Sequence, residues 1–200
     1  MPSTSSSPDR PRLNVRRTTI AAGIALVLVV AGVTAFSVLS ADESDEEGDA
    51  CRVDVAGASN PHVGDVAPAF TLPTLDGGCF HLRAERGRPV VVNFWASWCN
   101  PCRAEFPLLA DAYAKHRGEN LEIVGVTHRD IESDSRQFAD ELDVDWPLAF
   151  DDDQRVSRSY GITGIPQTIF VRRDGTISSR IFSELTKEDL DEELREIFRD

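Results

Sequence analysis

The sequence predicts an α/β domain, a layered sandwich with helices on both faces of a mixed β-sheet. Three observations lead to this fold class. Strand-like and helix-like segments alternate between residues 61 and 200. The run at residues 89–96 is almost continuously apolar, as expected for a central strand buried on both faces. The chain has 200 residues, of which 41% are hydrophobic, so we expect one domain with a core of ordinary size.

The first half of the domain is predicted to open with a β-hairpin. Residues 70–72 and 80–82 are strand-like and flank an Asp-Gly-Gly turn. The central strand follows this hairpin. Residues 100–117 are then predicted to form a helix, because apolar residues recur there at three- and four-residue spacing. Pro107 is expected to kink this helix, since proline has no N–H to donate.

The second half continues the alternation of strand and helix. Shorter strands and helices are predicted in turn at residues 121–126, 134–142, 146–150 and 156–160. A second hairpin is expected at residues 168–171 and 177–182, on either side of an Arg-Asp-Gly turn. The chain should close with a helix that has Thr186 as its N-cap and one apolar stripe.

An apolar, uncharged run at residues 18–39 precedes the domain. As an α-helix it would be about 33 Å long, which is enough to cross a bilayer. Residues 1–17 are basic and residues 40–60 are acidic, so the positive-inside rule predicts a cytoplasmic N-terminus, a transmembrane signal anchor and an acidic spacer. The domain at residues 61–200 would then face the outside of the cell membrane. A removable signal peptide cleaved near Ala41 is the alternative.

Charge and histidine placement disfavour two classes of function. The formal net charge is -13, which is unsuited to binding a polyanion, so no nucleic-acid partner is expected. An acidic surface of this kind is typical of a soluble exterior domain. The histidines are scattered and form no ligand cluster, so no metal and no cofactor is expected: His62, His81, His116 and His128.

The motif that carries chemistry is a C-x-x-C sequence, Cys99-Asn100-Pro101-Cys102, at a predicted strand-to-helix junction. Two cysteines at this spacing on a first helical turn lie on one face and can close a small disulfide ring. The helix N-terminus stabilises a thiolate at Cys99, which would attack a substrate disulfide, and Cys102 would resolve the mixed disulfide. The alternatives are half of a zinc site, for which a second ligand pair is missing, and a purely structural bridge.

Three motifs in order resemble one known family. They are the opening segment Gly64-Asp65-Val66-Ala67-Pro68-Ala69-Phe70-Thr71-Leu72, the redox motif Trp95-Ala96-Ser97-Trp98-Cys99-Asn100-Pro101-Cys102, and the loop Gly164-Ile165-Pro166-Gln167-Thr168. The chain from about residue 61 to residue 200 resembles the thioredoxin superfamily, specifically the membrane-anchored TlpA, ResA and CcmG/DsbE group. The resemblance implies a thioredoxin-like three-layer sandwich and protein-disulfide oxidoreductase activity.

The resemblance also implies roles for residues around the cysteine pair. It implies a cis peptide bond between Ile165 and Pro166, with the Ile165 backbone available to an extended substrate. It implies a tuning role for Glu105, for which a solvated helix-surface carboxylate is the alternative. We expect Trp98 and Pro101 to contact the substrate as well. The buried acid that thioredoxin carries in the preceding strand is replaced here by Asn93.

Two further cysteines, Cys51 and Cys79, lie outside the redox motif. On the exterior of the cell, where disulfides persist, they could pair. The chain-entropy relation gives such a bridge about 3 to 4 kcal/mol of stabilisation. Free thiols and an auxiliary redox pair are the alternatives.

The expected function is an extracytoplasmic thiol-disulfide reductase that reduces apocytochrome c or other exported protein disulfides during cytochrome c maturation. A membrane thiol-electron donor would re-reduce it. The sequence leaves open a disulfide oxidant for secreted proteins, which would differ in reduction potential. A non-catalytic copper chaperone of related fold is a third hypothesis, although such proteins resemble C-x-x-x-C with a distant histidine. Peroxidase activity is disfavoured by the tryptophan-rich context before Cys99.

Overall fold

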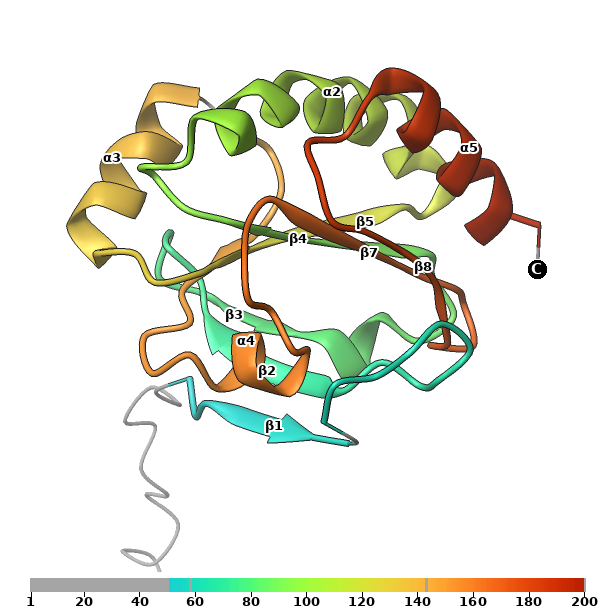
Figure 1. The fold of residues 1–200 in the computed structure, drawn as a ribbon, viewed down its shortest axis with the longest axis horizontal. Coiled ribbons are helices and arrows are strands. Elements are labelled where there is room, and N and C mark those ends of the chain that lie inside the picture. The colour runs from blue at the N-terminus through green and yellow to red at the C-terminus, as the bar shows by residue number, and fades with distance from the viewer. Residues whose placement is uncertain (1–50, 58, 143, 200) are drawn as a thin grey trace, which may run out of the picture. The chain divides into compact units, whose positions relative to one another are not determined.

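The computed structural model of the protein describes residues 51–57, 59–142 and 144–199 (Figure 1). The predicted cytoplasmic segment 1–17, the predicted membrane anchor 18–39 and the first part of the predicted spacer lie outside the described residues. Within the part that is described, none of the helices has the length and apolar character needed to cross a membrane.

A five-stranded mixed sheet forms the centre of the domain, with the strand order β6-β5-β4-β7-β8. Its strands are β4 (Val90–Trp95), β5 (Glu122–Thr127), β6 (Leu148–Ala149), β7 (Gln167–Val171) and β8 (Ile177–Ile181). β4 pairs in parallel with β5 and antiparallel with β7, and every residue of β4 is buried. The predicted central strand is therefore confirmed, since only a strand covered on both faces is apolar at successive positions.

A smaller antiparallel sheet, with the order β1-β2-β3, packs below the first. Its strands are β1 (Asp54–Ala56), β2 (Ala69–Pro73) and β3 (Cys79–His81). β2 and β3 form the predicted first hairpin. β1 lies within the segment predicted to be a spacer, so ordered structure begins earlier than expected. The segment is ordered because Val55 pairs with Phe70 of β2, so its backbone groups form hydrogen bonds within the sheet instead of with water.

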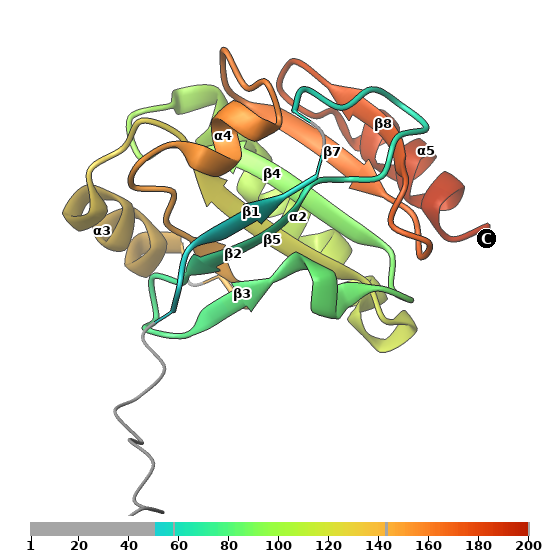
Figure 2. The same ribbon diagram turned by 90° about the horizontal axis from the view of Figure 1, so that it is seen from below.

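Helices cover the two faces of the large sheet unequally. α2 (Asn100–His116), α3 (Glu132–Leu142) and α5 (Lys187–Ile197) lie on one face, whereas the other carries, among the α-helices of the described residues, only the short α4 (Arg155–Ser159) (Figures 1 and 2). The small sheet covers the rest of that second face. The prediction of helices on both faces is thus confirmed, but the small sheet β1-β2-β3 takes the place of most of the second helical layer. Within the described ranges, two single-turn 3-10 helices are also present, at Leu82–Glu85 and Arg117–Glu119.

Local sequence signals account for the helix ends. Thr186 caps α5 as predicted, in a reciprocal capping box with Asp189. α2 runs through Pro107 as one helix, although this proline cannot donate the usual backbone hydrogen bond. A short loop joins the end of β4 to the start of α2, so the C-x-x-C motif lies at the carboxyl end of the central strand.

The core between the large sheet and the helical face is aromatic. Trp95 packs against Phe106 and Phe138, with ring centroids 5.3 and 4.9 Å apart. Gly125 of β5 makes room for this cluster, because a Cβ there would lie 2.8 Å from the indole nitrogen of Trp95 and 2.6 Å from Leu148. The glycine in the middle of an apolar strand is therefore a packing requirement. This cluster supports the start of α2 from below.

The structure joins Cys51 to Cys79 in a disulfide that ties the start of the described chain to β3. Because the bridge closes a loop over a sequence separation of 28, replacing both cysteines by serine is expected to lower the free energy of unfolding by about 3 to 4 kcal/mol. Urea unfolding of the oxidised proteins measures this loss. The redox motif provides the contrast, since its separation is only 3 and its closure restrains the unfolded chain far less. An unchanged midpoint would show that the bridge does not stabilise the fold.

Candidate active site

The cysteines of the C-x-x-C motif form a disulfide at the N-terminus of α2. Cys99 is the N-cap, and its sulfur accepts a hydrogen bond from the Cys102 backbone N–H at 3.2 Å. Cys99 keeps 4% of its surface exposed, whereas Cys102 is fully buried. Only Cys99 can therefore meet an incoming sulfur without movement of the helix. Pro101 occupies the first helical turn, where a missing N–H costs nothing.

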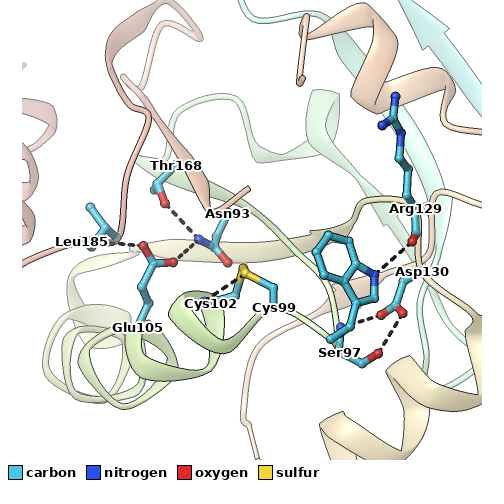
Figure 3. The surroundings of a disulfide bond; sticks show 10 residues. Asn93, Ser97, Cys99, Cys102, Glu105, Arg129, Asp130, Thr168 and Leu185 are labelled. Carbon is cyan, nitrogen blue, oxygen red and sulfur yellow. Dashed lines mark hydrogen bonds between the residues drawn. A yellow bond between two sulfur atoms is a disulfide. The ribbon is translucent and has the colours of Figure 1, made fainter. Parts of the chain in front are cut away.

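A carboxylate on the neighbouring loop fixes the segment before Cys99. Asp130 accepts hydrogen bonds from the Ser97 backbone N–H at 2.7 Å and from the Ser97 hydroxyl at 2.8 Å (Figure 3). It also accepts one from the Ser135 hydroxyl at 2.6 Å. Ser97 follows β4 and Asp130 follows β5, and parallel neighbours end at the same edge of a sheet. Sequence reasoning missed Asp130, although its place after a predicted parallel strand was a usable signal.

Trp98 lies at the surface beside the nucleophilic position, with 60% of its side chain exposed. Its indole N–H donates to the Arg129 carbonyl at 3.1 Å (Figure 3). This bond holds the ring in one place although few atoms cover it. By contrast Trp95 and Phe94 are completely buried, as expected of core residues.

The Ile165–Pro166 peptide bond is cis, as the resemblance implies. It precedes β7, in which Gln167 pairs with Phe94 of the central strand. Pro166 therefore lies one register position beyond that pair, beside the end of β4 that leads to the cysteines. Ile165 is half-buried and packs against the core cluster that contains both cysteines.

Behind the disulfide lies a buried polar group centred on Glu105, which is fully buried on α2. One carboxylate oxygen accepts the Leu185 backbone N–H at 2.6 Å, and the other accepts the Asn93 amide at 3.1 Å (Figure 3). Asn93 also donates to the Thr168 hydroxyl at 2.9 Å, while its own carbonyl oxygen has no partner among the residues that the structure describes. The alternative of a solvated surface carboxylate is wrong, because the loop before α5 closes over the side chain.

Burial raises the pKa of Glu105 from 4.5 to about 7. Loss of hydration disfavours the charged carboxylate and is the largest effect, and the exposed Glu184 nearby acts in the same direction. The hydrogen bonds from Leu185 and Asn93 act in the opposite direction, because they stabilise the charge. Glu105 can therefore bind or release a proton near neutral pH.

The predicted site residues thus fall into two places. Cys99, Cys102 and Glu105 lie on one helix, with Trp98 and the cis-proline loop beside them, while the Cys51–Cys79 bridge belongs to the small sheet. Across the described ranges, no three histidine, cysteine, aspartate or glutamate side chains are grouped so that they could hold a metal ion.

Comparisons with known proteins agree with this geometry. The family model described as AhpC/TSA family matches residues 63–180, more than half of the chain. The thiol-disulfide oxidoreductase ResA of Oceanobacillus iheyensis is 36% identical over 139 residues, which cover 68% of this chain and 72% of the relative. ResA of Bacillus cereus is 27% identical over 87% of this chain and 94% of its own length.

Solved structures of thiol-disulfide oxidoreductases are also similar to this chain. The thioredoxin domain of a thiol-disulfide oxidoreductase from Bacteroides vulgatus matches with a TM-score of 0.63 and 31% identity, over 70% of this chain and 99% of that one. A secreted disulfide oxidoreductase of Mycobacterium tuberculosis, described as homologous to Escherichia coli DsbE, matches with a TM-score of 0.58 and 25% identity, over 64% and 95% of the two chains. The chain therefore belongs to the AhpC/TSA family, as a thioredoxin-like thiol-disulfide oxidoreductase similar to ResA and DsbE.

Proposed function

We propose that the protein is an extracytoplasmic thiol-disulfide reductase that passes electrons from Cys99 and Cys102 to exported proteins, among them apocytochrome c. The observation that carries the proposal is the position of Cys99 as the cap of α2, with its sulfur accepting the Cys102 N–H. A thiolate there is stabilised by this hydrogen bond and by the positive end of the helix dipole. Cys99 is therefore the nucleophile.

The reaction proceeds by two thiol-disulfide exchanges. In the reduced protein the Cys99 thiolate attacks one sulfur of the substrate disulfide, and the other substrate sulfur leaves as a thiolate and takes up a proton. The Cys102 thiol then loses its proton and attacks the Cys99 sulfur, which releases the second substrate sulfur. Two electrons pass to the substrate, and the Cys99–Cys102 disulfide present in the structure is the oxidised product state.

Glu105 is the proposed acceptor for the proton of Cys102. It lies three residues after Cys102 on α2, and residues at this spacing share a helix face. A pKa of about 7 matches the task, because a general base is most effective when its pKa lies near the working pH. Burial keeps bulk water from competing for the same proton.

The proposed substrate surface surrounds Cys99. Trp98 offers an exposed apolar face, and Pro101 adds an exposed apolar ring in the first turn of α2. The backbone of Ile165, next to the cis Pro166, supplies groups that an extended peptide can pair with, as in other strand-addition complexes.

The sequence outside the described residues supports the proposed location. The apolar run 18–39 with basic residues before it anchors the chain in the cell membrane, with the cytoplasm at the N-terminus and the domain outside. A membrane thiol-electron carrier is the proposed donor of electrons, since such a carrier would connect this position with cytoplasmic reductant. The relatives bear the name thiol-disulfide oxidoreductase, and the Mycobacterium tuberculosis protein is described as secreted.

The reduction potential tests the direction of the reaction. The protein is equilibrated in glutathione or dithiothreitol buffers, and peptide mass spectrometry after alkylation follows the Cys99–Cys102 pair separately from Cys51–Cys79. We expect a value close to the thioredoxin value of about -270 mV, which suits a reductase. A value near about -120 mV would contradict the proposal and favour donation of disulfides to secreted proteins.

A further inference from the structure

The rim of the site carries a cationic side chain that the exchange reaction does not use. We propose that Arg129, together with the exposed Trp98 and Ile131, forms a docking surface that selects polypeptide substrates with a carboxylate side chain next to their reacting cysteines. The inference rests on the proposed redox role of Cys99 and adds a preference among its clients.

The backbone at Arg129 is held in an uncommon conformation. Its φ is 50°, in the left-handed region that residues with a Cβ rarely adopt. The conformation is fixed on both sides, since the Arg129 N–H donates to the Gln154 side chain at 3.0 Å and its carbonyl accepts the Trp98 indole N–H. Gln154 itself has a φ of 61° and donates to the Asp151 carbonyl at 2.6 Å. Two such residues bonded to each other beside a reactive site indicate a function that depends on their placement.

The Arg129 side chain is exposed, and its charge is not neutralised by the protein. Among the described residues, no carboxylate forms an ion pair with its guanidinium, which extends away from Asp130 (Figure 3). The adjacent Asp130 is occupied by the hydroxyls of two serines and by backbone N–H groups. Arginines on the neighbouring helices differ, because Arg103 pairs with Glu141 and Arg136 with Glu132.

Two exposed apolar side chains lie close to the Arg129 backbone. Trp98 is bonded to the Arg129 carbonyl, and Ile131, two residues further along, is 65% exposed. Aromatic and arginine side chains at a partly apolar patch are the residues that dominate binding energy in protein interfaces. The patch adjoins Cys99, so a polypeptide bound there presents its sulfur to the nucleophile.

Charge complementarity identifies the occupant. The whole chain has a net charge of -13, so it does not attract an acidic partner from a distance. Arg129 instead acts at contact, where a carboxylate of the substrate pairs with a guanidinium that has no other acid partner. The surface therefore fixes the position of an acidic substrate segment once it is bound, and it does not raise the rate at which substrate and protein meet.

The test compares peptides that differ only in the residues flanking one disulfide: glutamate, glutamine or lysine. Second-order rate constants for thiol-disulfide exchange are measured with the full-length protein and with Arg129→Ala, Arg129→Glu and the exposed Arg83→Glu of the Leu82–Glu85 helix as a matched charge control. Thermal unfolding of each variant reports whether its fold is intact.

We expect the wild-type protein to prefer the glutamate peptide over the glutamine peptide by about fivefold. Arg129→Ala should abolish the preference, Arg129→Glu should shift it to the lysine peptide, and Arg83→Glu should leave it unchanged. An equal preference in the wild-type and Arg129→Glu proteins would overturn the inference while leaving the redox role intact. Failure of the wild-type protein to exchange with any peptide would reject the redox role of Cys99 and the inference with it.

Discussion

Replacement of Cys99 by serine is expected to abolish thiol-disulfide exchange, with a loss of at least about a thousandfold in rate, because a serine hydroxyl is not ionised at neutral pH. Cys102→Ser should behave differently. Its Cys99 still keeps accessible surface at the helix N-terminus, so the first exchange proceeds and a mixed disulfide with the substrate accumulates. Non-reducing gel electrophoresis with a disulfide substrate distinguishes the two results.

The opposite pattern would show that Cys102, and not Cys99, is the nucleophile. If Cys99→Ser formed the trapped complex and Cys102→Ser did not, the buried sulfur would have to become accessible before reaction, contrary to the 0% exposure of Cys102. The Cys51→Ser and Cys79→Ser double variant is the matched control. It removes the other disulfide and is expected to retain exchange activity, provided that its loss of stability leaves it folded under the assay conditions.

Glu105→Gln is expected to change the pH dependence of stability more than any other single carboxyl substitution. The folded-state pKa of about 7 lies above the ordinary value of 4.5, so the folded protein binds this proton more tightly than the unfolded chain does. The stability that Glu105 contributes is therefore complete below about pH 4.5 and is lost as pH rises through 7. Glutamine keeps the neutral state at every pH.

The size of the effect follows from the pKa difference. One pKa unit corresponds to about 1.4 kcal/mol, so full ionisation of Glu105 costs about 3 kcal/mol of unfolding free energy above pH 8. Urea unfolding at pH 5 and at pH 8.5 measures it, and the wild-type protein should lose this amount relative to Glu105→Gln. Glu192→Gln, an exposed substitution on α5, is the control. Parallel losses in wild-type and Glu105→Gln proteins would show that the buried carboxyl does not titrate in this range.

The elements with strong local signals were predictable from the sequence. The apolar run of β4, the two hairpins and the Thr186 cap of α5 all depend on residues close together in the chain. The redox pair was predictable for the same reason, since the two cysteines need only a strand, a turn and the first turn of a helix. The cis bond before Pro166 was predictable only through the family resemblance, because local preference favours trans.

Contacts between distant segments were not predictable in this way. Glu105 meets the Leu185 N–H across 80 residues and Asn93 across 12, and these contacts turn a surface-like glutamate into a buried acid. Ser97 meets Asp130 across 33 residues because two parallel strands end together.

Local sequence patterns were therefore enough to predict the fold class and the reactive cysteines, whereas the surroundings of these cysteines depend on the tertiary structure. Periodicity and motif spacing describe what a chain does within one or two turns of helix or strand. The pKa of Glu105 and the placement of Arg129 depend instead on which loops close over α2 and which backbone groups they bring. These backbone groups come from segments that are distant in the chain and become neighbours only when the sheet assembles.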